Sequence, residues 1–122
     1  MASYIDAFII PVRKSKVDDY KKIARKMGKV WIEHGALEYH ETLADDVPYG
    51  KVTSFPRGVG RKNNETLVLG WALYKSKAHR DKVMAKVMSD KRMTEGFDDV
   101  ADVFDASRMV FGGFAEIISM SA

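Results

Sequence analysis

The stretch Thr-Leu-Val-Leu-Gly-Trp-Ala-Leu-Tyr at residues 66–74 is apolar on both of the faces that an extended chain presents. Successive side chains of a strand point to opposite sides of its sheet. One face of this stretch therefore carries Val68 and Ala72, and the other carries Leu67, Leu69, Trp71 and Leu73. Both faces of such a strand need cover from water, so the stretch predicts a strand inside a sheet that is covered on both sides.

Two more segments share this two-sided apolar character. Residues 4–12 are mainly β-branched or aromatic and predict a buried first strand, and residues 108–118 predict a final strand. The paired faces are Tyr4, Phe8, Ile10 against Ile5, Ala7, Ile9, and Met109, Phe111, Ile117 against Val110, Phe114, Ile118. Residues 37–44 alternate Leu37, Tyr39, Glu41 and Leu43 with more polar positions. This pattern indicates another strand, the second along the chain, whose two faces differ in polarity.

Helical periodicity separates these strands. Apolar residues from Val17 to His34 recur at helical spacing and predict a long amphipathic helix, with Ser15 as its N-cap and Gly35 at its end. Ser76 is placed to cap a second helix that reaches about Met88. Residues 93–104 predict a short acidic helix or loop with Phe97, Val100 and Phe104 turned inward.

The segment between the second strand and residues 66–74 is the least regular. Residues 45–50 predict a turn, and Pro56, Gly58 and Gly60 interrupt the extended pattern of residues 51–60. A structureless link of this length is unusual. We therefore predict an irregular strand over residues 53–60 that turns at Asn63 and Asn64 and pairs with residues 66–74.

The order strand, helix, strand, strand, helix, strand is the ferredoxin-like α+β plan, in which two helices cover one face of an antiparallel sheet. We expect one such domain over residues 1–122. Two helices leave the other apolar face open, as a patch larger than soluble monomers tolerate. The sequence therefore predicts a homodimer in which two sheets meet face to face.

Composition excludes several classes of protein. With 122 residues, 46% of them hydrophobic and none of them cysteine, the chain is a globular protein without a disulfide scaffold, zinc ribbon or thiol nucleophile. No apolar run approaches the ~20 residues of a membrane helix, and the N-terminus lacks a signal-peptide pattern. A cytoplasmic protein that does not enter the membrane is the expectation.

The net charge of +3 is unevenly distributed, because residues 13–29 hold eight of the basic residues and only two acidic ones. These cations lie on the solvent side of the first predicted helix, and no aromatic residue is interleaved among Lys21, Lys22, Arg25, Lys26 and Lys29 to stack on bases. We therefore expect any attraction to nucleic acid to be weak and indifferent to sequence.

Several segments resemble the YbaA-like family, a bacterial family known as domain of unknown function 1428. They are Tyr4-Ile5-Asp6-Ala7-Phe8, Gly35-Ala36-Leu37, Asp46-Val47-Pro48 followed by Gly50-Lys51-Val52-Thr53 and Phe55, Met88-Ser89-Asp90 with Arg92-Met93, and Arg108-Met109 with Gly112-Gly113-Phe114. The resemblance implies a fold of the dimeric α/β-barrel superfamily. It implies no chemistry, since no catalytic motif of that superfamily transfers residue by residue.

Six residues are candidates for a ligand site. Asp6 is a carboxylate near the middle of a probable central strand, and burial of its charge requires a partner. It is either bonded to backbone or arginine, or it is a pocket acid or base with a raised pKa. Glu41 offers a second carboxylate if its face is buried. Arg108 is a candidate for binding an anion, with a salt bridge as its simpler role. The remaining candidates would form apolar walls, with core packing as their simpler role: Phe8, Trp71 and Phe111.

The remaining motifs favour neither a metal nor a cofactor. The histidines, His34, His40 and His79, have no ligand-like spacing, and the glycines and cations of residues 57–62 lead into a turn rather than a helix. Phe111-Gly112-Gly113-Phe114 only weakly resembles an RNA-binding strand. Two classes of function fit: a protein or cofactor-independent enzyme that binds a small, partly apolar molecule between sheet and helices, or a non-catalytic interaction or regulatory module.

Overall fold

The computed structural model describes residues 3–95 and 100–122 of the chain. The strands are β1 (Tyr4–Arg13), β2 (Glu38–Leu43), β3 (Glu65–Tyr74) and β4 (Val110–Ala115). The helices are α1 (Val17–Glu33), α2 (Phe55–Gly58), α3 (Lys77–Met88) and α4 (Lys91–Thr94), with 3-10 turns at Lys14–Lys16, Val100–Asp102 and Ala106–Arg108. Phe97, predicted to point inward, lies outside the described residues.

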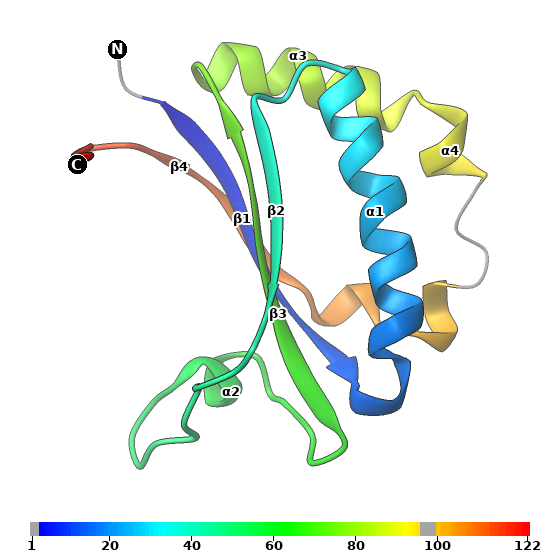
Figure 1. The fold of residues 1–122 in the computed structure, drawn as a ribbon, viewed down its shortest axis with the longest axis vertical. Helices are drawn as coiled ribbons and strands as arrows, with labels where there is room; N and C mark the ends of the chain where they lie inside the picture. The colour runs from blue at the N-terminus through cyan, green and yellow to red at the C-terminus, as the bar shows by residue number, and fades with distance from the viewer. Residues whose placement is uncertain (1–2, 96–99) are drawn as a thin grey trace.

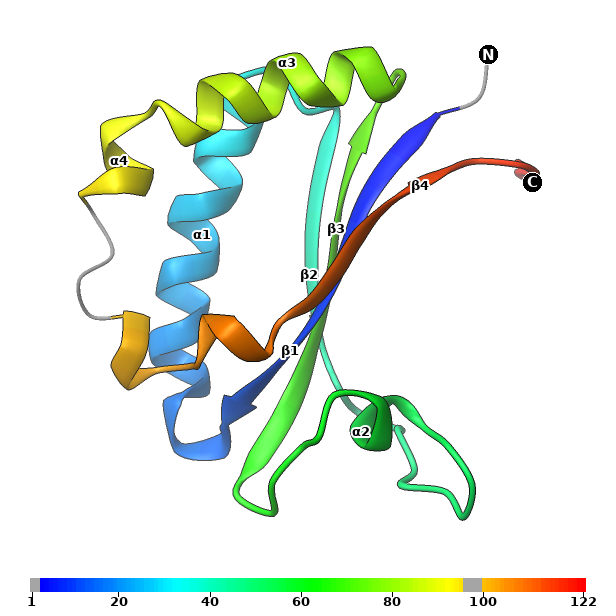
Figure 2. The same cartoon turned by 180° about the vertical axis from the view of Figure 1, so that it is seen from behind.

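The four strands form one antiparallel sheet in the order β2-β3-β1-β4. Helices α1 and α3 pack on the same face of this sheet, and the opposite face carries no helix of comparable length among the described residues (Figures 1 and 2). This arrangement is the ferredoxin-like α+β plan, so the predicted fold class is confirmed.

The core lies between the sheet and the two long helices. Even-numbered residues of β1 and β3 face the helices, where Ile10, Val12 and Tyr74 are fully buried. Two buried clusters result, one around Ile10, Val12, Tyr20, Val68, Val103 and Phe104, the other around Val30, Ala36, Ala72, Tyr74, Val83 and Val87. Val100 packs against the first cluster, so the inward orientation predicted for Val100 and Phe104 is observed.

Gly70 has a specific role in this core. It pairs with Phe8 across β1 and β3, and a Cβ atom at position 70 would lie 2.3 Å from the Phe8 ring. Phe8 can therefore lie flat over the sheet only because residue 70 has no side chain. The ring packs against the first buried cluster.

The boundaries of the two long helices, α1 and α3, agree with the sequence in all but one respect. Gly35 ends α1 with a φ of 111°, and Ser76 caps α3 by accepting a hydrogen bond from the backbone N–H of His79 at 3.1 Å. The predicted cap at Ser15 is wrong, because residues 14–16 form a 3-10 turn and α1 begins after Lys16 without a side-chain cap. The backbone of Lys14 donates to the carbonyl of Asn64 at 2.9 Å, which keeps the chain attached to the sheet past the end of β1.

The prediction of an irregular strand over residues 53–60 is also wrong. Ser54 accepts a hydrogen bond from the N–H of Arg57, and Pro56 occupies the first turn of the short helix α2. Proline lacks an N–H group and suits a helix start better than a strand interior. Strand β3 is already paired on both sides, with β1 and with β2. We call residues 44–62, which project beyond the sheet, the arm.

The final strand is shorter than predicted. β4 ends at Ala115, which pairs with Tyr4 at the start of β1. Among the described residues the pairing continues by one backbone bond, from the N–H of Glu116 to the carbonyl of Ser3. Residues 116–122 lie outside β4, and Ile117 is 92% exposed.

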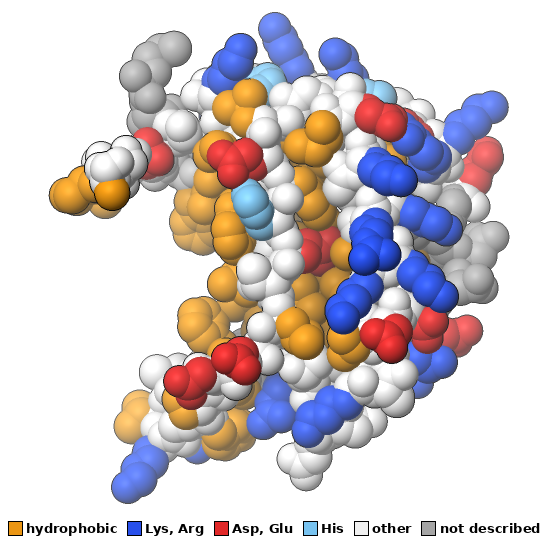
Figure 3. All heavy atoms as spheres, viewed as in Figure 1, with side chains coloured by type: hydrophobic (Ala, Val, Ile, Leu, Met, Phe, Trp, Pro, Cys, Tyr) orange, Lys and Arg blue, Asp and Glu red, His pale blue; other side chains and the backbone are white. Residues whose placement is uncertain are grey.

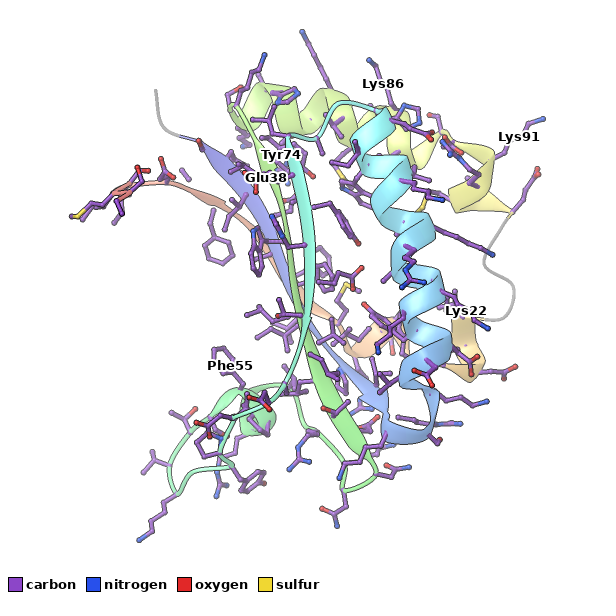
Figure 4. All side chains as sticks on the ribbon, viewed as in Figure 1. Lys22, Glu38, Phe55, Tyr74, Lys86 and Lys91 are labelled. Atoms are coloured by element: carbon purple, nitrogen blue, oxygen red, sulfur yellow. The ribbon has the colours of Figure 1, made fainter. Side chains whose placement is uncertain are left out.

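The sheet face opposite the helices, called the free face here, is apolar and open. Half-buried Ile5, Ile9 and Trp71 share it with more exposed side chains, among them Leu69 (39% exposed) and Phe114 (58%). Hydrophobic side chains line the hollow on this side, between the arm and the C-terminal segment (Figure 3). Phe55 of the arm points into the hollow (Figure 4). The sequence-based expectation that one apolar face of the sheet stays uncovered by helices is therefore confirmed.

Candidate functional site

An open groove of about 890 Å³ runs between α1 and β2. One wall is α1 from Val17 to Glu33, and the other is β2 from Tyr39 to Leu43. Its floor includes Val12 of β1 and Val68 of β3. In Figure 3 this groove has a hydrophobic floor with acidic atoms at its centre, and a row of basic side chains on α1 lies beside it.

Glu41 places a carboxylate inside the groove. It is an inward-facing residue of β2, and its two oxygens accept hydrogen bonds from two tyrosine hydroxyls. Tyr20 of α1 donates to Oε1, and Tyr39, two residues earlier on the same face of β2, donates to Oε2 at 2.7 Å. The carboxylate thus links the helix to the edge strand across the groove.

Packing holds both tyrosines in place. The Tyr20 ring meets Phe104 edge-on with ring centres 5.4 Å apart, and the Tyr39 ring lies 5.6 Å from that of Trp31. Each ring is therefore anchored in a different part of the core. The geometry around Glu41 is consequently set before any ligand binds.

The groove changes the acidity of all three groups. Burial raises the pKa of Glu41 above its ordinary value, although the hydrogen bonds from Tyr20 and Tyr39 partly oppose that rise. Burial and the neighbouring carboxylate raise the pKa of Tyr20 and Tyr39 as well. The tyrosines therefore remain hydrogen-bond donors, while Glu41 is the member of this trio that can take up or release a proton.

A row of cations borders the groove. Lys21, Arg25 and Lys29 succeed one another at intervals of one helical turn, and all three line it. Lys22 and Lys26 are on the same helix but do not line the groove, and Lys22 points away from β2 (Figure 4). The basic helix predicted from the sequence thus has two sides, and only one of them meets the groove.

Asp6 lies in a different place, beneath α3. It accepts a hydrogen bond from Arg80 Nη1 at 2.7 Å, and its side chain is 25% exposed. Arg80 also donates to the Tyr4 hydroxyl at 3.3 Å, and its guanidinium lies 4.9 Å from the centre of the Tyr4 ring. Of the two roles considered for Asp6, the arginine-bonded carboxylate is the one observed.

Replacing Asp6 by alanine should lower the free energy of unfolding by about 1.5 kcal/mol, the lower end of the range for a lost charged hydrogen bond. The loss is limited because Arg80 retains a second ion pair with Asp81 at 2.9 Å. Urea titration of Asp6→Ala and Asp6→Asn measures it, and Asp6→Asn should lose less because its amide oxygen can still accept from Arg80. A loss above about 3 kcal/mol would contradict this account.

The other candidates are dispersed. Arg108 donates to both oxygens of Glu65, at 2.6 and 2.9 Å, so it is held in an ion pair and does not face the groove. Trp71 lies on the free face, stacked on His40 with ring centres 4.9 Å apart. Phe111 is 77% exposed on the edge strand β4. Of the six candidates, Asp6, Phe8, Glu41, Trp71, Arg108 and Phe111, only Glu41 lines the groove.

Sequence reasoning missed both tyrosines and the cationic border as parts of a site. Tyr39 and Glu41 are two apart in a strand and therefore share a face, which is a detectable signal. Tyr20 sits in the apolar stripe of α1, and a buried hydroxyl there requires a partner. Which partner it finds depends on how α1 packs across β2.

Within residues 3–95 and 100–122 no group of three or more metal-ligating side chains is present. His34 bonds to Asp90 and His40 to Glu38, each at 2.8 Å, and His79 accepts from the backbone of Lys75. The same part of the chain has no helix long and apolar enough to cross a membrane.

Comparison with known proteins adds three findings. A profile of the family described as protein of unknown function (DUF1428) matches residues 3–106. The uncharacterized protein YbaA of Escherichia coli K12 is 43% identical over 115 residues, which cover 94% of this chain and 97% of YbaA, and the Shigella flexneri protein gives the same figures. A dimeric ferredoxin-like protein from an uncultured marine organism superposes over the whole of both chains with a TM-score of 0.55 at 13% identity, a likeness of fold alone.

Proposed function

The chain belongs to the DUF1428 family of proteins of unknown function, and we propose that it is a homodimer that binds a small, partly apolar molecule between α1 and β2. The observation that carries this proposal is the position of Glu41. Its carboxylate is held by two tyrosines inside a groove that is otherwise mainly apolar and open to solvent. Apolar walls around a few convergent polar groups are typical of small-molecule sites.

Glu41 provides a hydrogen-bond acceptor and an acid–base group for any molecule that places a suitable hydrogen opposite it. Its raised pKa brings the carboxyl closer to neutral pH than an exposed glutamate. A bound molecule with an O–H or an acidic C–H opposite Glu41 would donate to the carboxylate or transfer its proton to it. The second case is proton abstraction without a cofactor, the enzymatic form of the proposal.

The homodimer uses the opposite side of the sheet. The free face exposes Leu69, Val110 and Phe114, and the arm and the C-terminal segment border it (Figure 3). A second copy with the same apolar face is the simplest cover, through a contact related by a twofold axis. The similar fold of a protein described as dimeric supports this assembly. Ligand and partner would thus occupy different faces and can be tested separately.

The anionic dye 1-anilinonaphthalene-8-sulfonate tests the groove directly. Its fluorescence should rise on binding to the native protein, and Ile32→Trp should remove most of that rise, because residue 32 lines the groove and is half-exposed. Met88→Trp on α3 is the matched control, since Met88 is similarly exposed and does not line the groove. Equal fluorescence from both variants and the native protein would rule out the groove as the binding site.

Replacing Glu41 by glutamine should change how stability depends on pH. An unfolded chain ionises this carboxyl near 4.5, whereas the folded protein keeps the proton to higher pH. The folded state therefore binds more protons in that window, and ionising Glu41 lowers the free energy of unfolding as pH rises. Glutamine cannot ionise but can still bond to both tyrosines.

We expect Glu41→Gln to gain stability relative to the native protein between about pH 4 and pH 8. Urea titrations across this range at one protein concentration measure the difference. Asp45→Asn, on the exposed arm, is the control for removal of a carboxylate. A difference between Glu41→Gln and native protein that stays constant over the range would contradict the raised pKa.

A further inference from the structure

We infer that the molecule bound between α1 and β2 is a linear acyl chain with an anionic head group, such as a medium- or long-chain carboxylate. This inference rests on the proposed function, whose groove it uses. Three features carry it: the length of the groove, the chemistry of its walls, and the separation of its positive border from Glu41.

The groove is long. Its lining residues on α1 extend from Val17 to Glu33, which spans roughly 24 Å at 1.5 Å per residue. More than four consecutive turns of one helix therefore contribute to a single groove. A compact ring would fill only part of such a space, whereas an extended alkyl chain can lie along it.

Aliphatic side chains form most of the apolar lining. They are Val12, Val17, Ala24, Ile32, Leu43 and Val68. The aromatic residues in the lining, Tyr20 and Tyr39, have their hydroxyls committed to Glu41. Burial of methylene groups against these side chains should raise affinity about three- to fourfold for each added CH₂ until the groove is filled.

Charge sets the direction in which an anion enters. Lys21, Arg25 and Lys29 stand at the border, and none of them forms an ion pair with Glu41 within the described residues. Lys21 contacts Asp18 only at 3.9 Å, with both side chains largely exposed, so that pair is weak. An anionic head gains from the cations and is repelled by the Glu41 carboxylate, so the head stays at the border while the chain occupies the floor.

Calorimetric titration with decanoate, dodecanoate and tetradecanoate, each below its micelle concentration, tests the inference. Dodecanol, dodecyltrimethylammonium and benzoate are the comparison ligands. Affinity should rise with chain length, dodecanoate should bind more tightly than dodecanol, and the ammonium compound and benzoate should bind most weakly. Ile32→Trp should weaken the binding of every acyl ligand, because the larger tryptophan side chain fills part of the groove.

Two variants of α1 isolate the head group. The triple change Lys21→Gln, Arg25→Gln, Lys29→Gln should remove the preference of dodecanoate over dodecanol, because it weakens the binding of dodecanoate more than that of dodecanol. Lys22→Gln with Lys26→Gln is the control, since both residues are exposed on the same helix away from the groove. It should retain the preference at the same ionic strength.

The possible failures are distinguishable. If the dye binds the native groove and Ile32→Trp abolishes it, but carboxylates show no chain-length dependence, the acyl inference is wrong and the proposed function stands. If neither dye nor acyl ligand responds to Ile32→Trp, both are wrong. Equal loss of the preference in the triple variant and the control, or tighter binding of the ammonium compound, overturns the role of the border cations. Displacement of dodecanoate by an oligonucleotide at physiological salt assigns these cations to nucleic acid instead.

Discussion

At micromolar concentration the protein should have twice its chain mass of 13.8 kDa, and Leu69→Lys should convert it to a monomer. Leu69 lies near the middle of the free face, paired with Ile9 of β1 and Thr42 of β2. A lysine there would bury an unpaired charge between the two sheets. A loss of about 4 kcal/mol of association free energy corresponds to roughly a thousandfold weaker dimer.

Size exclusion coupled to light scattering measures this change. Leu69 is 39% exposed in the single chain, so Leu69→Lys should keep its fold, which circular dichroism can verify. Met88→Lys, on the outside of α3, is the matched control and should remain dimeric. A native protein that is monomeric at these concentrations would refute the face-to-face dimer, while a dimeric Leu69→Lys variant would place the interface elsewhere.

Replacing Arg108 by alanine should reduce the free energy of unfolding by about 3–5 kcal/mol, the range for breaking a buried ion pair from one side. Glu65 is 7% exposed, and Arg108 donates to both of its oxygens. Arg108 also donates to the carbonyl of Gly60 at 2.7 Å, so it connects β3 to the end of the arm. Removal of the guanidinium leaves the glutamate charge with the backbone N–H of Lys62, at 2.8 Å, as its remaining donor among the described residues.

Urea titration at a fixed protein concentration measures this loss, since unfolding of a dimer depends on concentration. The double variant Arg108→Leu with Glu65→Leu is the informative control, because replacing both charges by apolar groups removes the unpaired carboxylate. It should be more stable than Arg108→Ala alone. If the double variant is the less stable of the two, the attraction between Arg108 and Glu65 exceeds the free energy needed to remove both charges from water.

Glu65 and Glu41 should change the pH dependence of stability in opposite directions. The guanidinium of Arg108 holds the pKa of Glu65 below its ordinary value, so this pair contributes stability above about pH 4.5 and loses it as pH falls through the lowered pKa. As the pH falls, the free energy of unfolding of Arg108→Ala should therefore decrease less than that of the native protein. The effect has the opposite sign to that of Glu41, whose raised pKa lowers stability as pH increases.

Much of the fold is predictable from periodicity within single segments. The alternation of residues 66–74 and 4–12 predicts two-sided strands, and the spacing from Val17 to His34 predicts α1. The order of these elements then implies the ferredoxin-like plan, and the quoted family segments identify the family. Periodicity works here because a strand or helix repeats its own geometry at every residue.

The arm shows where such local reasoning stopped. The length of the link favoured a strand over residues 53–60, but Ser54 and Pro56 together begin a helix, and β3 already has β2 as its neighbour. A further strand could pair with β3 only if one of the two edges of β3 were unpaired. Whether an edge is unpaired is known only once the whole sheet has formed, so residues 53–60 by themselves do not indicate it.

The assembly of the candidate site depended on tertiary structure. Glu41 meets Tyr20 across 21 positions of sequence, and Arg108 meets Glu65 across 43. Residue types made Glu41 and Arg108 candidates, but they did not indicate that Glu41 would face a groove or that Arg108 would pair with Glu65. Such contacts depend on the register of the strands and on the position of α1 over the sheet, which are set by packing between elements and leave no period in the sequence.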